Sequence, residues 1–268
     1  MTILCKVCGH NSLTNIGSVD SDRANNPIDP FPFGKTGVDI NYWQCESCSF
    51  IFTKDWDGKD ASFWQEEIYN SDYVEHVDPE YNSIRSDLLT PVLLSFAKII
   101  SKSLFANGAI DMLDYGSGTC RLHDNFKAAG KEVHSYDPYS LKSTIPTNKI
   151  YNLVFAIEVF EHEVQPKFLM NNLARLTAED AVVIFSTKLS KDSNLDWKYI
   201  APRNGHLSIY SKQSLHALAS SSGFMYQRLA FFHVFSKRKL SSRLILNLVL
   251  SEVKHRFYRE LNKRVFNK

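Results

Sequence analysis

Met112-Leu-Asp-Tyr-Gly-Ser-Gly-Thr-Cys120 is the stretch of sequence that decides the fold. A run of apolar residues ends in the acidic Asp114. Gly116 and Gly118 then open a turn, and residues 121–129 can begin a helix. Glycine has no Cβ, so the backbone of such a turn can approach a ligand closely. The helix that follows directs its N-terminus toward whatever lies over the turn. The stretch therefore predicts a strand, a ligand-binding turn and a helix, in that order.

Two classes of ligand suit this turn. A dinucleotide would place its pyrophosphate on the N–H groups, but its fingerprint G-x-G-x-x-G requires a third glycine. That spacing is absent, because Thr119, Cys120 and Arg121 follow Gly118 and none of them is a glycine. S-adenosylmethionine has no phosphate but carries a sulfonium cation, an amine and a ribose diol, so an acceptor such as Asp114 suits it. An ordinary strand-to-helix turn without a ligand is the alternative that so short a motif leaves open.

The sequence after the turn continues an alternation of strands and helices. Residues 131–137 form a second predicted strand whose last residue is acidic, 23 residues beyond Asp114. Residues 151–157 are a continuous apolar run, as a buried parallel strand requires, and a predicted helix over 166–176 and strand over 181–186 follow. Alternating strands and helices predict an α/β fold with a parallel sheet, whose ligand site lies at the carboxyl ends of the strands.

The residues at those strand ends carry a family resemblance. The 112–120 turn resembles motif I of class I S-adenosylmethionine-dependent methyltransferases, and Glu158-Val-Phe-Glu-His162 resembles the E-V-x-E-H segment that follows a later strand in that family. The resemblance implies a Rossmann-like sheet, with Asp137 on the cofactor ribose and Glu158 near the sulfonium or the substrate entrance. The residues it implies at the methionine end of the cofactor are Asp114, Tyr115, Gly116 and Gly118.

The charge of the chain is unevenly distributed. The 268 residues carry a net charge of +2, but residues 237–268 contain ten Lys and Arg against two Asp and Glu, a local +8 that leaves −6 on the rest. No stretch approaches the ~20 apolar residues that span a bilayer, and the first residues lack the basic and apolar regions of a signal peptide. We therefore expect a cytoplasmic protein, with peripheral attachment to the inner face of the membrane as one role of the basic tail.

Four of the five cysteines form two C-x-x-C units. Cys5 and Cys8 make the first unit, Cys45 and Cys48 the second, and 36 residues separate them. Paired units of this kind in a reducing compartment favour metal over disulfides, and four thiolates complete a closed tetrahedral Zn²⁺ site. Because a closed site leaves no position for water, we expect a structural zinc ion, with reduced, unligated thiols as the alternative.

Composition divides the chain into four parts. We expect a zinc-binding module over 1–55, an aromatic and helical bridging region over 56–109, a catalytic domain over 110–236 and a basic amphipathic helical tail over 237–268. Within the bridging region, Pro91 should interrupt a helix or start a second one, because proline lacks the N–H that a helix interior requires.

The segment between the second and third predicted strands is short. Only 13 residues separate Asp137 from Tyr151, too few for a helix, a strand and a second helix. We therefore expect the third strand of the class I sheet to be reduced or missing. Further on, Ser211 should cap a helix over 212–221, and residues 224–235 should form one or two closing strands. The family resemblance implies that these strands run antiparallel at the edge of the sheet.

Apolar residues recur at helical spacing in the tail, with basic residues on the opposite face. Three kinds of partner suit such a helix: its own domain or a second copy of the chain, an anionic membrane surface, or a nucleic acid. The apolar positions are Leu246, Val249, Leu250, Val253, Phe257, Leu261 and Val265.

The order of these features resembles a group of bacterial methyltransferases that pair a small N-terminal zinc-binding domain with a class I catalytic domain. The resemblance covers the chain to about residue 236 and implies S-adenosylmethionine, a structural zinc ion, and a sugar, a glycan or another small molecule as acceptor. It also implies that Tyr69 and Tyr73 lie over the cofactor, although aromatic residues there suit a hydrophobic core equally. Cys120 departs from the glycine usual in the family, which should hold the next helix slightly farther from the sheet.

A hydroxyl acceptor needs a base that removes its proton, a task that histidine suits near neutral pH. His206 lies in a loop after the last predicted parallel strand, where substrate contacts are usual, and we expect it to be the base. His162 and Glu161 are its predicted partners, with Glu161 orienting His162. For both histidines a structural role in the loops is the alternative. Arg203 suits a phosphate or carboxylate of the substrate, with an ordinary surface arginine as an equal alternative.

The sequence favours O-methylation of a small-molecule or glycan hydroxyl. A second hypothesis is an rRNA or tRNA methyltransferase with a zinc ribbon, since the tail is basic. Residues 1–55 are not basic, however, and a domain that follows a nucleic-acid backbone needs cations, so we expect no nucleic-acid partner. The third hypothesis is a non-catalytic, cofactor-binding scaffold whose tail recruits other proteins, which the departure at Cys120 leaves open.

Overall fold

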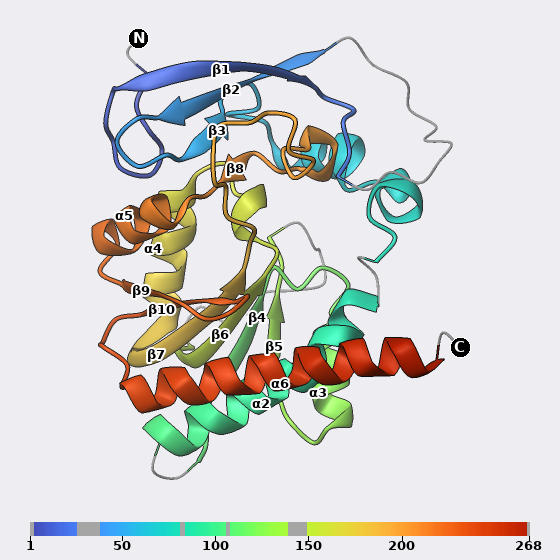
Figure 1. The fold of residues 1–268 in the computed structure, drawn as a ribbon, viewed down its shortest axis with the longest axis vertical. Helices are drawn as coiled ribbons and strands as arrows, with labels where there is room; N and C mark the ends of the chain where they lie inside the picture. Colours follow the sequence, from blue (N-terminus) through green and yellow to red (C-terminus); the bar gives the residue numbers. More distant parts are fainter. Residues whose placement is uncertain (1–2, 26–37, 81–83, 106–107, 139–148, 267–268) are drawn as a thin grey trace.

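The computed structural model describes residues 3–25, 38–80, 84–105, 108–138 and 149–266, with side chains described up to residue 260. Among these residues it contains two sheets, a six-stranded sheet in the order β5-β4-β6-β7-β10-β9 and a four-stranded sheet in the order β1-β2-β3-β8. Figure 1 shows the smaller sheet at the top, above the larger one. The larger sheet carries the strands that the glycine turn predicted.

The six-stranded sheet is mostly parallel. Strands β5, β4, β6 and β7 run parallel to one another, and β10 and β9 close one edge in antiparallel pairing. This is the Rossmann-like α/β sheet that the sequence predicts, with closing strands of the expected direction. The strand bounds are β4 Met112–Tyr115, β5 His134–Tyr136, β6 Tyr151–Ile157, β7 Thr177–Ser186, β9 Met225–Arg228 and β10 His233–Ser236.

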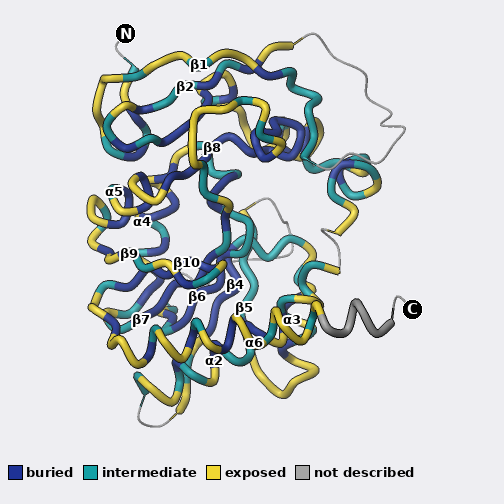
Figure 2. Tube along the Cα trace, viewed as in Figure 1, coloured by how far each residue is buried: buried dark blue, intermediate teal, exposed yellow. Residues whose placement is uncertain are grey.

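Helices cover both faces of this sheet, because side chains alternate along each strand. Val154 and Val183 belong to a buried cluster with α4 and α5, whereas their neighbours Leu153 and Val182 belong to a second cluster with α2, α3 and α6. Figure 2 shows buried strands between helices whose outer turns are exposed. The helix bounds are α2 Ile84–Leu104, α3 Arg121–Ala128, α4 Pro166–Leu176, α5 Lys212–Ser221 and α6 Ser242–Phe266.

Several elements have the bounds that the sequence predicts. Strand β6 and helices α4 and α5 match residue for residue. Pro166 opens α4, where its missing N–H leaves no helical hydrogen bond unmade. Ser211 caps α5 as expected, because its hydroxyl accepts the N–H of Ser214 at 2.9 Å. Local signals of periodicity and capping were therefore sufficient for these elements.

Pro91 does not interrupt the bridging helix, so that prediction was wrong. Helix α2 runs through it without a break. Proline removes one helical hydrogen bond, but the residues that follow, Val92, Leu93 and Phe96, are buried in the cluster beneath the sheet. Burial of these side chains keeps the helix continuous in spite of the missing bond.

The described part of the central sheet has no strand between β5 and β6. The expected reduction of the third strand nevertheless stays a prediction. Most of the short segment on which that expectation depended, residues 139–148, lies outside the described residues.

The smaller sheet is not built from the N-terminal residues alone. Its fourth strand comes from the segment after the 202–206 loop, which the sequence placed in the catalytic domain, and it pairs antiparallel with β3. The module is thereby joined to the catalytic domain by a strand pair. The bounds are β1 Leu13–Asp20, β2 Asp39–Cys45, β3 Ile51–Thr53 and β8 Ser208–Ile209.

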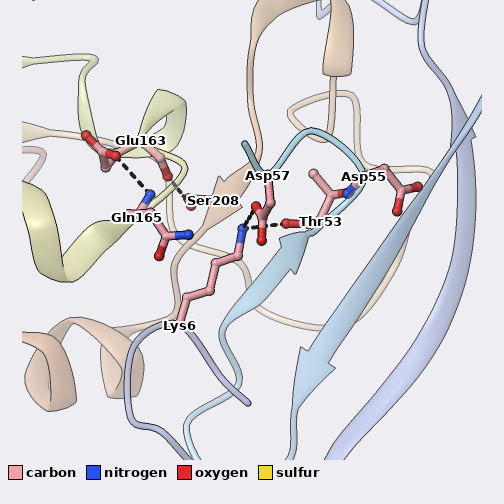
Figure 3. A network of polar contacts seen from close by, with 7 residues as sticks. All are labelled: Lys6, Thr53, Asp55, Asp57, Glu163, Gln165 and Ser208. Carbon is pink, nitrogen blue, oxygen red and sulfur yellow. Dashed lines mark hydrogen bonds and ion pairs between the residues drawn. The ribbon is translucent and has the colours of Figure 1, made fainter. Parts of the chain in front are cut away.

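Polar contacts reinforce this junction (Figure 3). The hydroxyl of Ser208 donates to the carbonyl oxygen of Glu163 at 2.6 Å. Nearby, the ammonium of Lys6 donates to the carbonyl oxygen of Thr53 at 2.7 Å and pairs with Asp57. The remaining short helical elements are α1 Ala61–Phe63, η1 Trp64–Ile68, η2 Tyr73–Val77, η3 Phe160–His162 and η4 Pro202–Asn204.

The basic tail forms helix α6, as predicted, and packs on α2 (Figure 1). Leu244 and Leu248 are buried in the same cluster as the α2 side chains, and the hydroxyls of Ser251 and Ser95 lie 2.7 Å apart. None of the described helices is long and apolar enough to cross a membrane.

The predicted apolar stripe of the tail lies mostly on a different face of α6 from the one that packs. Leu246, Leu250, Val253 and Phe257 are 55%, 57%, 49% and 65% exposed. These side chains do not join the core of their own domain, and a partner for them stays a prediction.

Candidate active site and metal centre

The glycine turn connects β4 to α3, as predicted, and lies against the end of β5. The N–H groups of Gly116 and Ser117 donate to the carbonyl oxygen of Tyr136 at 2.7 and 3.1 Å. The N–H of Gly118 donates to Oδ2 of Asp137 at 2.8 Å. The acid that ends the second strand therefore lies on the turn that follows the first.

Asp114 and Asp137 form an acidic region at the ends of β4 and β5. Asp114 is buried, and burial together with the negative charge of Asp137 raises the pKa of Asp114 to about 7. A ligand that brings positive charge or hydrogen-bond donors to this region would favour the ionised carboxylates.

Close packing of the turn against Val159 requires a glycine at position 116. Gly116 has φ +77°, and a Cβ there would lie 2.4 Å from Cγ2 of Val159. Cys120, which departs from the family pattern, also has a left-handed backbone, with φ +62°, and provides no side-chain cap for α3. Such a conformation costs a non-glycine residue about 1–3 kcal/mol. The expected outward shift of the helix stays a prediction.

A cavity of about 550 Å³ lies at the carboxyl ends of β6 and β7. This volume is in the range of small-molecule sites, roughly 300–1,000 Å³. Gly116 and Asp137 are not part of its wall, so the turn and the cavity are two separate parts of the candidate site. Among the residues that line the cavity are Arg85, Glu158, His162, Ser186, Lys188 and His206.

Glu158 is fixed at the cavity wall by Ser186, which follows from the next strand. Its Oε1 accepts the Ser186 hydroxyl at 2.9 Å, and its N–H donates to the same hydroxyl oxygen at 3.0 Å. The backbone of Glu158 has φ +54°, an uncommon conformation that is often found at functional positions. Sequence reasoning found Glu158 but missed Ser186, the last residue of an apolar strand.

His162 and His206 meet at the cavity, although 44 positions separate them in the chain. Their ring centroids are 5.0 Å apart. Burial lowers the pKa of His162 to about 4, and burial and the neighbouring His162 lower the pKa of His206 well below its usual value. Both rings are therefore neutral at pH 7.

The tautomer of His206 follows from its partner. Its Nδ1 lies 2.8 Å from the carbonyl oxygen of Tyr199. A carbonyl only accepts, so Nδ1 carries the proton and Nε2 of the neutral ring retains its lone pair. His206 thus has the form that can accept a proton at Nε2.

Glu161 is fully buried behind the histidines, and it does not form the predicted hydrogen bond to His162. Oε1 accepts the hydroxyl of Tyr199, and Oε2 has no hydrogen-bond partner in the described part of the chain. Burial, and then the charge of Glu158, raise the pKa of Glu161 to about 8. Tyr199 connects Glu161 to His206, because its hydroxyl bonds to Glu161 and its carbonyl oxygen to His206. The sequence did not predict this residue, since an aromatic residue in a loop is its only distinguishing feature.

The bridging aromatics lie beside the histidines. The hydroxyl of Tyr69 is 3.2 Å from Nδ1 of His162, and the ring of Tyr73 is T-shaped to that of Tyr69 at 5.2 Å. Both tyrosines pack in the buried cluster under the N-terminal module and neither lines the cavity. Their predicted place over a cofactor stays a prediction.

Arg203 holds the bridging region rather than facing a ligand. It is 5% exposed, and its guanidinium donates to the carbonyl oxygen of Ile68 at 2.7 Å and to Oδ1 of Asn70 at 3.0 Å. Its interpretation as a substrate-binding group was therefore wrong, because these internal bonds occupy the guanidinium.

The four paired cysteines converge at the edge of the smaller sheet. Sγ of Cys5 and Cys48 lie 3.7 Å apart, those of Cys8 and Cys45 lie 3.5 Å apart, and all four lie within 4.8 Å of one another. Zn–S bonds of about 2.3 Å in a tetrahedron give S···S edges of about 3.8 Å. The four thiols therefore fit a tetrahedral metal ion.

The backbone of each cysteine pair forms a knuckle. The N–H of Gly9 donates to the carbonyl oxygen of Cys5 at 2.9 Å, and the N–H of Ser49 donates to that of Cys45 at 2.7 Å. Gly9 and Ser49 both have a left-handed backbone, with φ +79° and +55°. The small residue after each second cysteine is therefore what allows the turn.

Comparison with known proteins identifies a family model. Residues 73–229 match a family described as "Methyltransferase domain". No curated protein matches the sequence.

Three of the solved structures that match this chain are methyltransferases by name. The sugar N-methyltransferase KedS8 from Streptoalloteichus sp ATCC 53650 is 10% identical, with a TM-score of 0.41 over 57% of this chain and 89% of that one. An O-methyltransferase family protein from Burkholderia thailandensis is 10% identical, with a TM-score of 0.38 over 56% and 57%. Human N-acetylserotonin methyltransferase is 13% identical, with a TM-score of 0.40 over 65% and 60%. The chain spans less than two thirds of the last two.

Proposed function

The chain belongs to the methyltransferase-domain family, whose model covers more than half of its residues, and from this premise we propose that it methylates a hydroxyl group of a sugar, a glycan or another small molecule with S-adenosylmethionine. The observation that carries the proposal is the pair of neutral histidines, His162 and His206, at the wall of a 550 Å³ cavity at the carboxyl ends of β6 and β7.

S-adenosylmethionine suits the turn between β4 and α3. Asp114 and Asp137 form an acidic region there, and the amine, the ribose hydroxyls and the sulfonium of the cofactor would supply the donors and the positive charge that ionised carboxylates need. Asp137 would hold the ribose, and the bare backbone of Gly116 would admit the methionine end. When bound, the cofactor supplies a methyl group on a positively charged sulfur that leaves readily.

Glu158 suits a position between the turn and the acceptor. It follows β6 directly and lines the cavity with a carboxylate that Ser186 holds in place. A fixed negative charge at this point would attract a sulfonium and help to orient it.

His206 suits the role of the base. Bound S-adenosylmethionine would supply the methyl group to the acceptor oxygen, and Nε2 of His206 would accept the proton that the hydroxyl loses. The bond from Nδ1 to Tyr199 keeps the ring in the required tautomer. The low pKa of His206 makes it a weak base, so orientation of the reactants and exclusion of water must supply most of the rate enhancement.

A structural Zn²⁺ ion suits the four cysteines. A closed four-thiolate site would stabilise the N-terminal module without taking part in the reaction. The module would then support the site indirectly, because the hydroxyl of Tyr42 donates to the carbonyl oxygen of His206 at 2.9 Å.

Two measurements test the proposed function. In isothermal titration, S-adenosylmethionine should bind the wild type, and Asp137→Asn should weaken binding by roughly tenfold or more, because a charged hydrogen bond is lost. Asp124→Asn, an exposed acid on α3, is the matched control and should bind normally. Methyl transfer from labelled cofactor to a panel of nucleotide sugars and glycans then identifies the acceptor. Absence of binding heat with the wild type would contradict the proposal.

A further inference from the structure

We propose that helix α6 forms an anion-binding wall of the acceptor site, and that the acceptor carries a phosphate or carboxylate group held by Arg256 and Arg259. The inference rests on the proposed methyltransferase function of the same cavity. It gives the basic tail a role inside the site.

One face of α6 lines the cavity. Glu252, His255, Arg256 and Arg259 belong to its wall, and their spacing of three, four and seven residues places them on one side of a helix. The residues of α6 that pack on α2 lie at other positions, and so does the exposed apolar stripe. The tail thus has three faces, and one of them belongs to the candidate site.

Glu252 fixes this face against the turn between β9 and β10. Its carboxylate is 3% exposed and accepts the N–H groups of Ala230, Phe231 and Phe232 at 2.9, 2.5 and 2.8 Å. One turn along α6, the guanidinium of Arg256 lies 3.8 Å from the ring centroid of Phe231, within reach of a cation–π interaction. The position of Arg256 at the wall is therefore set by the protein itself.

Four acidic residues line the cavity; three of them already have protein partners, and the fourth, Glu80, is exposed to solvent. Asp78 accepts two hydrogen bonds from the guanidinium of Arg85, at 2.8 and 2.9 Å. Glu252 accepts three backbone N–H groups, and Glu158 accepts the hydroxyl of Ser186. These carboxylates are thus satisfied without a cationic ligand.

Apart from Arg85, which pairs with Asp78, the basic residues of the cavity differ in this respect. Lys188 and Arg256 form no ion pair in the part of the chain that the structure describes. Arg259 forms an ion pair with Glu260 at 3.7 Å, but its buried Nε has no hydrogen-bond partner among the described residues. A cavity wall with cations that lack such partners favours an anionic ligand.

Guanidinium groups specify the kind of anion. Their N–H donors form a planar fork that matches two oxygens of a phosphate or a carboxylate. Arg256 and Arg259 are three residues apart on a helix, so both can reach one such group. Lys188, at the end of β7, provides a further positive charge at the same cavity.

The test uses two anions that differ in chemistry, inorganic pyrophosphate and glucuronate. Each is titrated calorimetrically into the wild type, into Arg256→Gln/Arg259→Gln and into Lys254→Gln, at low salt and with or without saturating S-adenosylmethionine. Lys254 is exposed on the same helix and does not line the cavity, so it is the matched control. We expect the double variant to weaken binding by about tenfold or more and the control to bind as the wild type does.

The two probes separate the sources of the anion. Binding of pyrophosphate alone indicates a phosphate-bearing acceptor, binding of glucuronate alone indicates a carboxylate-bearing one, and either result supports the proposal. The proposal is overturned if neither probe binds, if the double variant binds both as the wild type does, or if S-adenosylmethionine displaces the probe. Arg256→Gln, at an exposed position, is the second variant in case the double variant does not fold.

The anion titration and the cofactor titration fail independently. Arginine-dependent binding of pyrophosphate without any binding of S-adenosylmethionine would contradict the proposed function and leave the anion site standing. Binding of S-adenosylmethionine without binding of either anion would contradict the anion site and leave the proposed function standing.

Discussion

The cysteine cluster and the cluster of Glu161, His162 and His206 are alike in size but differ in origin and access. In both, the candidate ligand atoms lie within 4.8 Å of one another. Each half of the cysteine cluster is a knuckle of five residues whose bonds are local. The histidine cluster is assembled from two loops that only the folded chain brings together, and both of its imidazoles open onto a cavity.

The difference suits the two roles proposed above, a structural one for the cysteine cluster and a chemical one for the histidine cluster. A closed set of four thiols can satisfy a metal ion completely and leaves no position for a substrate. In the histidine cluster, by contrast, burial shifts three pKa values and one carboxylate oxygen of Glu161 has no partner among the described residues. Such costly buried groups are typical of functional sites.

The two clusters are nevertheless connected. The hydroxyl of Tyr42, on β2, donates to the carbonyl oxygen of His206, and the N–H of Thr53, on β3, donates to that of Leu207 at 3.2 Å. The second cysteine knuckle connects these two strands. Order in the N-terminal module should therefore be needed for the position of the proposed base.

The largest effect is expected from loss of the cysteine cluster. Cys48→Ser should release the metal and unfold the module, because structural zinc ions contribute on the order of 10 kcal/mol to folding. Zinc content by mass spectrometry and thermal unfolding measure the effect, with Cys120→Ser as the control that keeps its zinc. Turnover should disappear as well, because β2 and β3 hold the loop of His206. A stable, active Cys48→Ser variant would contradict the connection.

A smaller effect, confined to the reaction, is expected from the histidine cluster. His206→Gln should lower kcat/KM by roughly 10²–10⁴-fold, the usual contribution of a general base. Binding of S-adenosylmethionine and the melting temperature should stay close to the wild-type values, which would separate this cluster from the cysteines. His10→Gln, at an exposed position, is the control. Full turnover by His206→Gln would reject its role as base.

The smallest effect is expected in the pH dependence of stability. The pKa of His162 is about 4 in the folded chain against 6.5 for a free imidazole. As the pH falls, the imidazole is therefore protonated in the unfolded chain before it is protonated in the folded chain. The contribution of the neutral His162 to the free energy of unfolding is present above pH 6.5 and is lost as the pH falls. Between pH 6.5 and 5 the loss is about 1.6 kcal/mol. Urea unfolding at both pH values should show a smaller loss for His162→Gln, and an equal loss would contradict the neutral, buried imidazole.

Local structure was predictable wherever the interactions lie within a few residues. Strand β6 and helices α4 and α5 follow from an apolar run, a helical period and a capping serine, and the two knuckles follow from cysteine spacing and a small residue after each pair. The direction of the closing strands was also predicted. In each case the signal and the structure occupy the same short stretch of chain.

Elements that depend on distant partners were not predicted. Helix α2 continues through Pro91 because of burial against other elements, and β8 is a strand only because it finds β3. Tyr199 gives no signal before the fold places its hydroxyl on Glu161. The tail was predicted as an amphipathic helix, but not that one of its faces would line the cavity.

The sequence by itself determined the parallel sheet, the glycine turn with its acids and the four-cysteine cluster, because each depends on residue types at short spacing. Only the tertiary structure decided that His162 meets His206, that Glu161 bonds to Tyr199 and that Arg256 and Arg259 face the cavity. The physical reason is that burial, pKa shifts and the pairing of charges depend on neighbours from other parts of the chain. No local pattern in the sequence encodes those neighbours.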